Sequence, residues 1–301
     1  MSLRARLLRW FLWTIARPLV AASLEVEGAR RRFRRAARVL FHAPPLSLML
    51  RMQGPVPGLW VQNQPRARGV ILFFHGGAYM MGAPETHAAM IAELARLAGL
   101  PAFMPRYRLA PEHRFPAAFD DALNAWNRLR ALGHTPGEIV LGGDSAGGGL
   151  ALALLSHLCR IGQPPAGAFA FSPWTDLTLT GASLKANARR DPLLPVDRIG
   201  EVRSMILGAP ASADPADPRL SPLFAAFPDA PPVQIHVAET EILLDDALRL
   251  QGPLPGADIR VHGDLPHVWP IFHNHLPEAR NTLATTASFI HACLAQSSAG
   301  S

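Results

Sequence analysis

The chain has 301 residues, of which 49% are hydrophobic and 17% charged, and this composition excludes a disordered or collagen-like protein. The net charge of +6 is local: the first 40 residues hold ten Arg and two Glu, whereas the other 261 carry 19 basic and 21 acidic side chains. Because a nucleic-acid-binding domain spreads basic residues over its folded face, nucleic acid is not expected as a partner. Cys159 and Cys293 provide neither a disulfide framework nor metal-ligand spacing, so we expect no metal and a cytoplasmic location.

The first 45 residues are predicted to form one or two helices. Five apolar side chains recur at helical spacing between arginines, namely Leu7, Leu8, Phe11, Leu12 and Ile15. The apolar run 10–16 is far shorter than the roughly 20 residues that a bilayer requires. We therefore expect this stripe to be buried against the body of the protein, as in a cap; weak contact of the N-terminal helix with a membrane surface is the alternative.

From residue 46 onward, short apolar runs alternate with helical patterns. Strands are predicted at 59–62, 70–74, 101–105, 138–142, 168–171 and 233–237, and helices at 90–98, 117–132, 145–159, 245–250 and 276–294. This alternation indicates a mostly parallel sheet with helices on both faces. Between about 179 and 221 the sequence is polar, rich in Pro and Ala and without a clear strand, and we interpret it as an insertion over the sheet edge.

A serine stands between a predicted strand and a predicted helix, in the sequence Gly143-Asp144-Ser145-Ala146-Gly147. Glycines two positions before and after Ser145 leave room for the strained turn that exposes a nucleophile. A turn that only packs a helix on a sheet, or that binds a phosphate, is the alternative. No Lys follows these glycines and no G-x-G-x-x-G spacing is present, so the pattern favours a nucleophile braced by Asp144.

A second glycine loop, His75-Gly76-Gly77-Ala78, follows the predicted strand at 70–74. Backbone N–H groups of glycines can approach the oxyanion of an acyl-transfer reaction closely, because no side chain intervenes. We expect Gly76 and Gly77 to supply two donors to an oxyanion hole and Ala146 the third. A base is the alternative role for His75, but its place at the strand end favours ordering of the loop.

Several motifs together resemble the bacterial hormone-sensitive lipase-like branch of the α/β-hydrolases. They are H-G-G-A-Y from residue 75, Y-R-L-A-P-E-H-R-F-P-A-A-F-D-D-A from 107, G-D-S-A-G-G from 143, S-P-W-T-D from 172, D-P-L from 191 and P-H-V-W from 266. The resemblance covers about 60–295 and implies an α/β-hydrolase fold and a carboxylesterase without metal or organic cofactor. It also implies a small helical cap, which divides the chain into cap helices at 1–45 and a catalytic domain at 46–301 with its cap insertion at about 179–221.

The general base of this fold is a histidine on a late loop, since the chain order is Ser, acid, His. Only His267 lies in a loop between a strand-like run and the predicted terminal helix, so it is the expected base. In the family the acid commonly stands in a D-P-L-x-D-E pattern, and Glu241 occupies that position here. Asp245 stays the alternative, although attraction to the helix dipole already explains a carboxylate in a first helical turn.

These residues predict a serine carboxylesterase that hydrolyses short- to medium-chain esters through an acyl-enzyme. Four further residues are candidates for the substrate pocket or for core packing: Tyr79, Met80, Met81 and Trp174. An amidase or peptidase of the same fold is the alternative among enzymes, whereas a ligand-binding receptor on this fold would be expected to lack His267. We expect a small-molecule ester as the substrate, and the sequence is compatible with a monomer or a homodimer.

Overall fold

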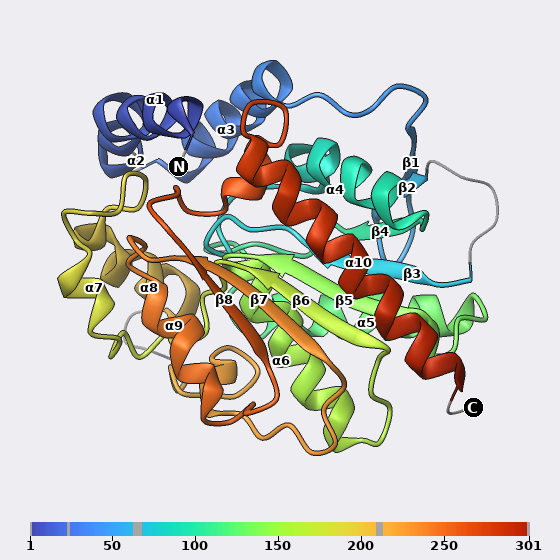
Figure 1. The fold of residues 1–301 in the computed structure, drawn as a ribbon. Coiled ribbons are helices and arrows are strands. Elements are labelled where there is room, and N and C mark those ends of the chain that lie inside the picture. Colours follow the sequence, from blue (N-terminus) through green and yellow to red (C-terminus); the bar gives the residue numbers. More distant parts are fainter. Residues whose placement is uncertain (1, 23–24, 63–67, 209–212, 300–301) are drawn as a thin grey trace.

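A computed structural model of the protein describes residues 2–22, 25–62, 68–208 and 213–299. In this part of the chain, eight strands form one sheet in the order β1-β2-β4-β3-β5-β6-β7-β8 (Figure 1). The strands are β1 Leu48–Met52, β2 Gly58–Gln62, β3 Val70–Phe74, β4 Ala102–Pro105, β5 Ile139–Asp144, β6 Gly167–Phe171, β7 Val233–Ala238 and β8 Asp258–His262. The two pairings made by β2 are antiparallel and the others are parallel, so the prediction of a mostly parallel sheet is confirmed.

Helices cover both faces of the sheet (Figure 1). On one face lie α4 Pro84–Ala98 and α10 Pro277–Ala299, and on the other α5 Ala117–Ala131 and α6 Ala146–Arg160. Single helical turns complete the connections: η2 Pro136–Glu138, η3 Val196–Arg198, η4 Pro222–Phe224, α9 Leu244–Leu248, η5 Arg249–Gln251 and η6 Trp269–Phe272. Since both faces are covered, every residue of β3, β5, β6 and β7 is buried, which explains their continuous apolar runs.

The edge strand β1 was not predicted from the sequence. Its Leu48 and Leu50 are 51% and 49% exposed, so its apolar residues contribute little to the core. Hydrogen bonds to β2 hold this strand in place. A strand stabilised mainly by main-chain pairing has a weak hydrophobic pattern, and this explains the omission.

The N-terminal segment forms α1 Leu3–Phe11, a π-helical turn η1 Leu12–Ala16, α2 Arg17–Ala22 and α3 Val26–Leu40. The expectation that its apolar stripe is buried was wrong for Leu7, Phe11 and Ile15, which are 60%, 42% and 46% exposed. The packed face instead contains Ala5, Leu8, Leu12 and Ala16. These residues pack in the hydrophobic cluster that also contains side chains of α4 and α10. The apolar residues extend around more than one side of the helix, so the spacing did not determine which side would be packed.

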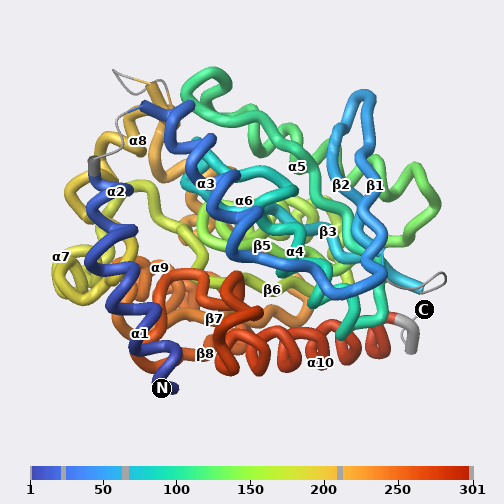
Figure 2. Tube along the Cα trace, turned by 90° about the horizontal axis from the view of Figure 1, so that it is seen from above, coloured from blue at the N-terminus to red at the C-terminus, as the bar shows by residue number. Residues whose placement is uncertain are grey.

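The N-terminal helices lie beside the segment that connects β6 to β7, which contains α7 Ser183–Ala186 and α8 Ile199–Leu207 (Figure 2). Two arginines make the direct link: Arg9 donates to the carbonyl of Arg190 at 2.8 Å and Arg17 to that of Ala188 at 2.6 Å. Residues 209–212 of the predicted insertion lie outside the described residues.

Candidate active site

Ser145 occupies a strained turn between β5 and α6. Its φ of +52° and ψ of −124° are rare for a residue with a side chain and indicate stored strain. A Cβ atom at Gly143 would overlap the backbone of Gly147, and one at Gly147 would overlap the carbonyl oxygens of Phe74 and His75. The two glycines of the motif are therefore required by the close approach of neighbouring backbone.

Three predicted residues meet at the carboxyl end of the parallel strands. Ser145 Oγ lies 2.9 Å from His267 Nε2, and His267 Nδ1 lies 2.5 Å from Glu241 Oε2. A carboxylate can only accept, so His267 donates from Nδ1 and its Nε2 is free to accept the serine proton. Glu241 follows β7 and His267 follows β8; both are buried, at 0% and 5% exposure.

The second oxygen of Glu241 is held by two donors. Oε1 accepts from Ser172 Oγ at 2.8 Å and from the Ala238 N–H at 2.7 Å. Ser172 Oγ also accepts from the N–H of Val268, the residue after His267, at 3.1 Å. One buried hydroxyl thus connects the carboxylate to the loop of the histidine and fixes their relative position.

The pKa of His267 is raised above its ordinary 6.5. Burial is the largest single influence and opposes the imidazolium, but the charge and hydrogen bond of Glu241, together with the charges of Asp191 and Asp144, outweigh it. This arrangement favours the positively charged form of the His267 ring.

Two other carboxylates near Glu241 bind main-chain donors. Asp246 accepts from the N–H groups of Thr175 and Asp176, both at 2.8 Å, and burial raises its pKa to about 7. Asp245, the alternative acid, accepts from the N–H of Ser183 at 2.8 Å, and the structure does not bring it to His267.

Asp191 is fully buried and contacts the backbone immediately after Glu241. One of its oxygens accepts from the Ile242 N–H at 3.0 Å, and the other accepts from Leu193 and Leu194. Burial raises the pKa of Asp191. Because Asp191 belongs to the segment between β6 and β7, it ties that segment to the loop of Glu241.

The glycine loop differs from the expectation at Gly76. The N–H of Gly76 donates to Asp144 Oδ1 at 2.9 Å, so this group is already engaged in bracing the loop. The N–H groups of Gly77, Ala78 and Ala146 have no acceptor among the described residues. Asp144, which we expected to brace the turn of Ser145, thus contacts the glycine loop instead. The N–H groups without an acceptor in this part of the chain include that of Ala78, which the sequence analysis did not single out.

The glycine loop begins at His75, whose ring is buried among other aromatic rings. His75 stacks on Tyr107 at 4.4 Å between ring centroids, and the Tyr107 hydroxyl donates to the carbonyl of His75 at 2.6 Å. Burial is the main cause that lowers the pKa of His75 to about 3, so its ring is neutral. The geometry agrees with a role for His75 in ordering the loop, since His267 is the histidine in contact with Ser145.

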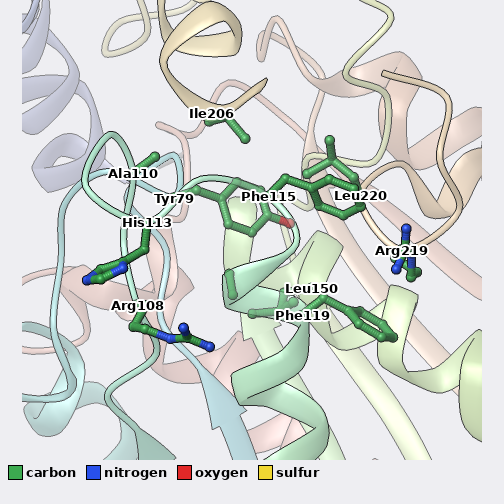
Figure 3. A pocket seen from close by; sticks show the side chains of 11 residues that line it. Tyr79, Arg108, Ala110, His113, Phe115, Phe119, Leu150, Ile206, Arg219 and Leu220 are labelled. Carbon is green, nitrogen blue, oxygen red and sulfur yellow. The ribbon is translucent and has the colours of Figure 1, made fainter. Parts of the chain in front are cut away.

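A narrow cleft is lined by Leu150 of α6 and by Ile206 of α8, a helix of the insertion (Figure 3). Of the four predicted pocket residues, Tyr79 lines this cleft, whereas Met80, Met81 and Trp174 do not. Tyr79 is 3% exposed and its hydroxyl has no partner among the described residues. The remaining lining residues are Arg108, Ala110, His113, Phe115, Ala118, Phe119, Leu150, Ile206, Arg219 and Leu220.

Residues 71–269 match a family model described as alpha/beta hydrolase fold. The chain is 36% identical to an esterase of Acinetobacter venetianus over 80% of both chains, and 36% identical to an acetyl-hydrolase of Streptomyces hygroscopicus over 77% of this chain and 78% of that one. The chain belongs to the α/β-hydrolase family. A crystal structure of an esterase from the bacterial hormone-sensitive lipase family aligns with a TM-score of 0.90, 34% identity and coverage of 98% of this chain and 99% of that one.

This α/β-hydrolase is therefore a carboxylesterase of the hormone-sensitive lipase-like group. Sequence reasoning missed Ser172 and Asp191 as contacts of the Glu241 loop, although both stand in motifs that carried the family resemblance. The available signal was that each is a polar residue in a motif of the family to which we had assigned no role. Within the described residues, no group of three or more His, Cys, Asp or Glu side chains is placed to hold a metal ion.

Proposed function

We propose that Ser145 attacks the carbonyl carbon of a short- to medium-chain carboxylic ester and forms an acyl-enzyme. His267 takes the serine proton at Nε2 and returns it to the leaving alcohol, while Glu241 holds the imidazole and stabilises its charged form. Water then attacks the acyl-enzyme with His267 again as the base, and Ser145 is regenerated. The observation that supports this most strongly is the unbroken chain from Ser145 Oγ through His267 to Glu241, at 2.9 and 2.5 Å.

The proposed oxyanion donors are the N–H groups of Gly77, Ala78 and Ala146. Support comes from their lack of any other acceptor among the described residues and from the engagement of Gly76 with Asp144. Donors that are already oriented cost no reorganisation during the reaction, and one such donor contributes about 3 to 4 kcal/mol to the transition state.

The cleft beside Tyr79 is the proposed end of the acyl-chain site, and its cavity volume of about 10 Å³ leaves room for only a short chain end. It is lined mainly by apolar side chains, and its Leu150 lies on the helix that begins directly after the nucleophile. Ile206 of α8 closes the cleft from the insertion, so a long chain would meet this side chain. Met80, Met81 and Trp174 stay predictions as pocket residues.

The N-terminal helices and the insertion are proposed to act as a cap. Arg9 supports this role because it forms an ion pair with Asp264 and donates to Thr240 Oγ1 at 3.3 Å, next to the loops of Glu241 and His267. A cytoplasmic location is also a proposal, and two buried cysteines that are not in a disulfide agree with it.

The first test is covalent labelling with a fluorophosphonate, followed by mass spectrometry of the labelled peptide. The label is expected on Ser145 in the wild type, and initial rates on p-nitrophenyl esters of increasing chain length are expected to peak at short or medium chains. Labelling at another serine, or rates that rise steadily to the longest ester, would contradict the proposal.

The second test narrows the cleft. Ile206→Trp is expected to lower kcat/KM for longer acyl chains by about tenfold, because the larger side chain fills the cleft, while acetate ester turnover changes little. Ser204→Trp is the matched control, since Ser204 lies exposed on the same helix. Equal effects of the two variants would place the acyl chain elsewhere.

A further inference from the structure

The outer face of α1 and α2 is unusually apolar for a surface helix. Leu3, Leu7 and Trp10 recur at helical spacing along α1 and are 70%, 60% and 65% exposed, and Leu19 on α2 is 56% exposed. The inner face of α1 is already packed against the protein through Ala5 and other small or apolar residues. The segment therefore carries two apolar faces, and covering the body of the enzyme explains only the inner one.

Arginines flank this outer face. On a helix with 100° between successive residues, Arg4 and Arg6 fall on opposite sides of the line through Leu3, Leu7 and Trp10. Both guanidinium groups are exposed and neither has an ion-pair partner in the part of the chain that the structure describes. An exposed apolar face with arginines on both margins and a tryptophan among its residues is typical of helices that lie in the interface of a bilayer.

The neighbouring helix α3 is also rich in arginine. In both views α1, α2 and α3 lie together along the outside of the molecule (Figures 1 and 2). Arg34 and Arg38 of α3 line an open groove together with Arg51 and Arg106, and Glu85 is the acidic residue among its lining side chains. The three helices belong to the segment of ten Arg and two Glu that accounts for the positive charge of the protein.

We propose that the outer face of α1 and α2 docks onto the surface of an anionic lipid bilayer. The apolar side chains enter the boundary between headgroups and acyl chains, and Arg4 and Arg6 contact lipid phosphates at its margin. None of the described helices is long and apolar enough to cross a bilayer. This proposal does not rest on the assignment of the catalytic residues.

Charge selects a bilayer over a second copy of the chain as the occupant. A symmetric dimer through this face would bring the same arginine-rich patch onto itself, because the interface of such a dimer uses one patch from both subunits. Like charges in contact oppose that association. Anionic headgroups neutralise the same arginines, and each Arg near such a surface strengthens binding by roughly fivefold.

Docking would hold the active site close to the lipid. Arg9, on the inner side of α1, contacts Thr240 and Asp264, and these residues neighbour Glu241 and His267 in the chain. The helix that contacts the bilayer on one side thus contacts the loops of the proposed triad on the other. Esters dissolved in the bilayer are the substrates that this arrangement brings nearest to Ser145.

Co-sedimentation of the full chain with vesicles tests the proposal. Vesicles of phosphatidylcholine alone and vesicles that also contain phosphatidylglycerol are the two probes. The wild type is expected to bind the anionic vesicles, to bind neutral ones far more weakly, and to lose much of the binding in high salt, since salt screens the attraction of arginine for phosphate. Absence of binding to anionic vesicles would overturn the proposal.

Matched variants locate the surface. Leu3→Ser/Leu7→Ser/Trp10→Ser is expected to lower the partition coefficient by about tenfold or more, and Arg4→Gln/Arg6→Gln by a similar factor. The controls are Leu132→Ser/Ile161→Ser, which replace apolar residues that are 57% and 50% exposed elsewhere, and Arg68→Gln/Arg160→Gln. All four variants are expected to hydrolyse p-nitrophenyl acetate at the wild-type rate, which shows that they are folded.

Two results would reject this surface. Equal loss of binding in the control variants would mean that general charge or hydrophobicity drives the association. A wild-type dimer by light scattering that the Leu3, Leu7 and Trp10 substitutions convert to a monomer, without vesicle binding by either form, would assign the face to a second copy of the chain.

Discussion

The carboxyl end of the sheet and the N-terminal helices lie against each other, yet they are built in different ways. At the carboxyl end of the sheet, Ser145, His267 and Glu241 are joined by hydrogen bonds, and both Glu241 and His267 are buried. The N-terminal helices instead attach through arginine side chains and small apolar contacts, and they leave large apolar residues in solvent. The first region has one arrangement that satisfies its polar groups, whereas the second leaves an apolar face exposed, on which our docking proposal rests.

The largest expected effect comes from Ser145, the proposed nucleophile at the carboxyl end of the sheet. Ser145→Ala is expected to lower kcat on a soluble ester by at least about 10⁴-fold and to abolish phosphonate labelling, because the proposed mechanism forms the acyl-enzyme on this hydroxyl alone. Thermal unfolding checks that the fold is retained. Vesicle binding is expected to be unchanged. A folded variant that lost both ester hydrolysis and vesicle binding would show that the site at the carboxyl end of the sheet and the N-terminal helices are not independent.

Glu241, the proposed acid of the triad, is expected to give the next largest effect. Glu241→Gln is expected to lower kcat by about 10³- to 10⁴-fold, because the amide removes the charge that stabilises the imidazolium. Without that charge the pKa of His267 falls, so the acid limb of kcat/KM against pH is expected to move to lower pH. Asp245→Asn is the control and is expected to stay within a few-fold of the wild type; the reverse order would place the acid at Asp245.

Arg30 tests how firmly the helices support the glycine loop. Its guanidinium donates to the carbonyl of Met80 at 2.7 Å and to that of Ala110 at 2.9 Å. Arg30→Met is expected to lower kcat several-fold and the free energy of unfolding by about 2 kcal/mol, since both carbonyls lose a charged donor. The neighbouring Arg31, which pairs with the exposed Glu25, provides the control: Arg31→Met is expected to change neither quantity appreciably. Equal effects would mean that α3 contributes only general packing.

Asp246 is expected to give the smallest effect, visible only in stability. Burial raises its pKa from 3.8 to about 7, so between these values the folded state binds more protons than the unfolded state. Stability from this group is therefore lost as the pH rises from about 4 to about 7. Asp246→Asn keeps an oxygen for the N–H groups of Thr175 and Asp176 and is expected to flatten this dependence of Tm. A Tm profile with the wild-type slope would contradict the raised pKa.

The sequence predicted the candidate site at the carboxyl end of the sheet far better than it predicted the packing of the N-terminal helices. A serine at a positive φ between close backbones needs glycines at fixed positions, so the motif around Ser145 specifies its geometry. No comparable constraint marks Leu7 or Phe11, because a helix with apolar residues on several sides can pack through any of them. The use of Gly76 by Asp144, and the contact of Ser172 with Glu241, depend on residues far apart in the chain and could not be derived from spacing.

The arginines that fasten the N-terminal helices share one property: Arg9, Arg17 and Arg30 all donate to carbonyl oxygens of the main chain. Every residue type has that oxygen, so exchanging the side chains at Ala188 or Arg190 leaves the acceptors in place. Ala188 and Arg190 can therefore be exchanged without loss of these two hydrogen bonds. Directed evolution of substrate preference can randomise these two positions while Arg9, Arg17 and the buried Asp191 are kept fixed.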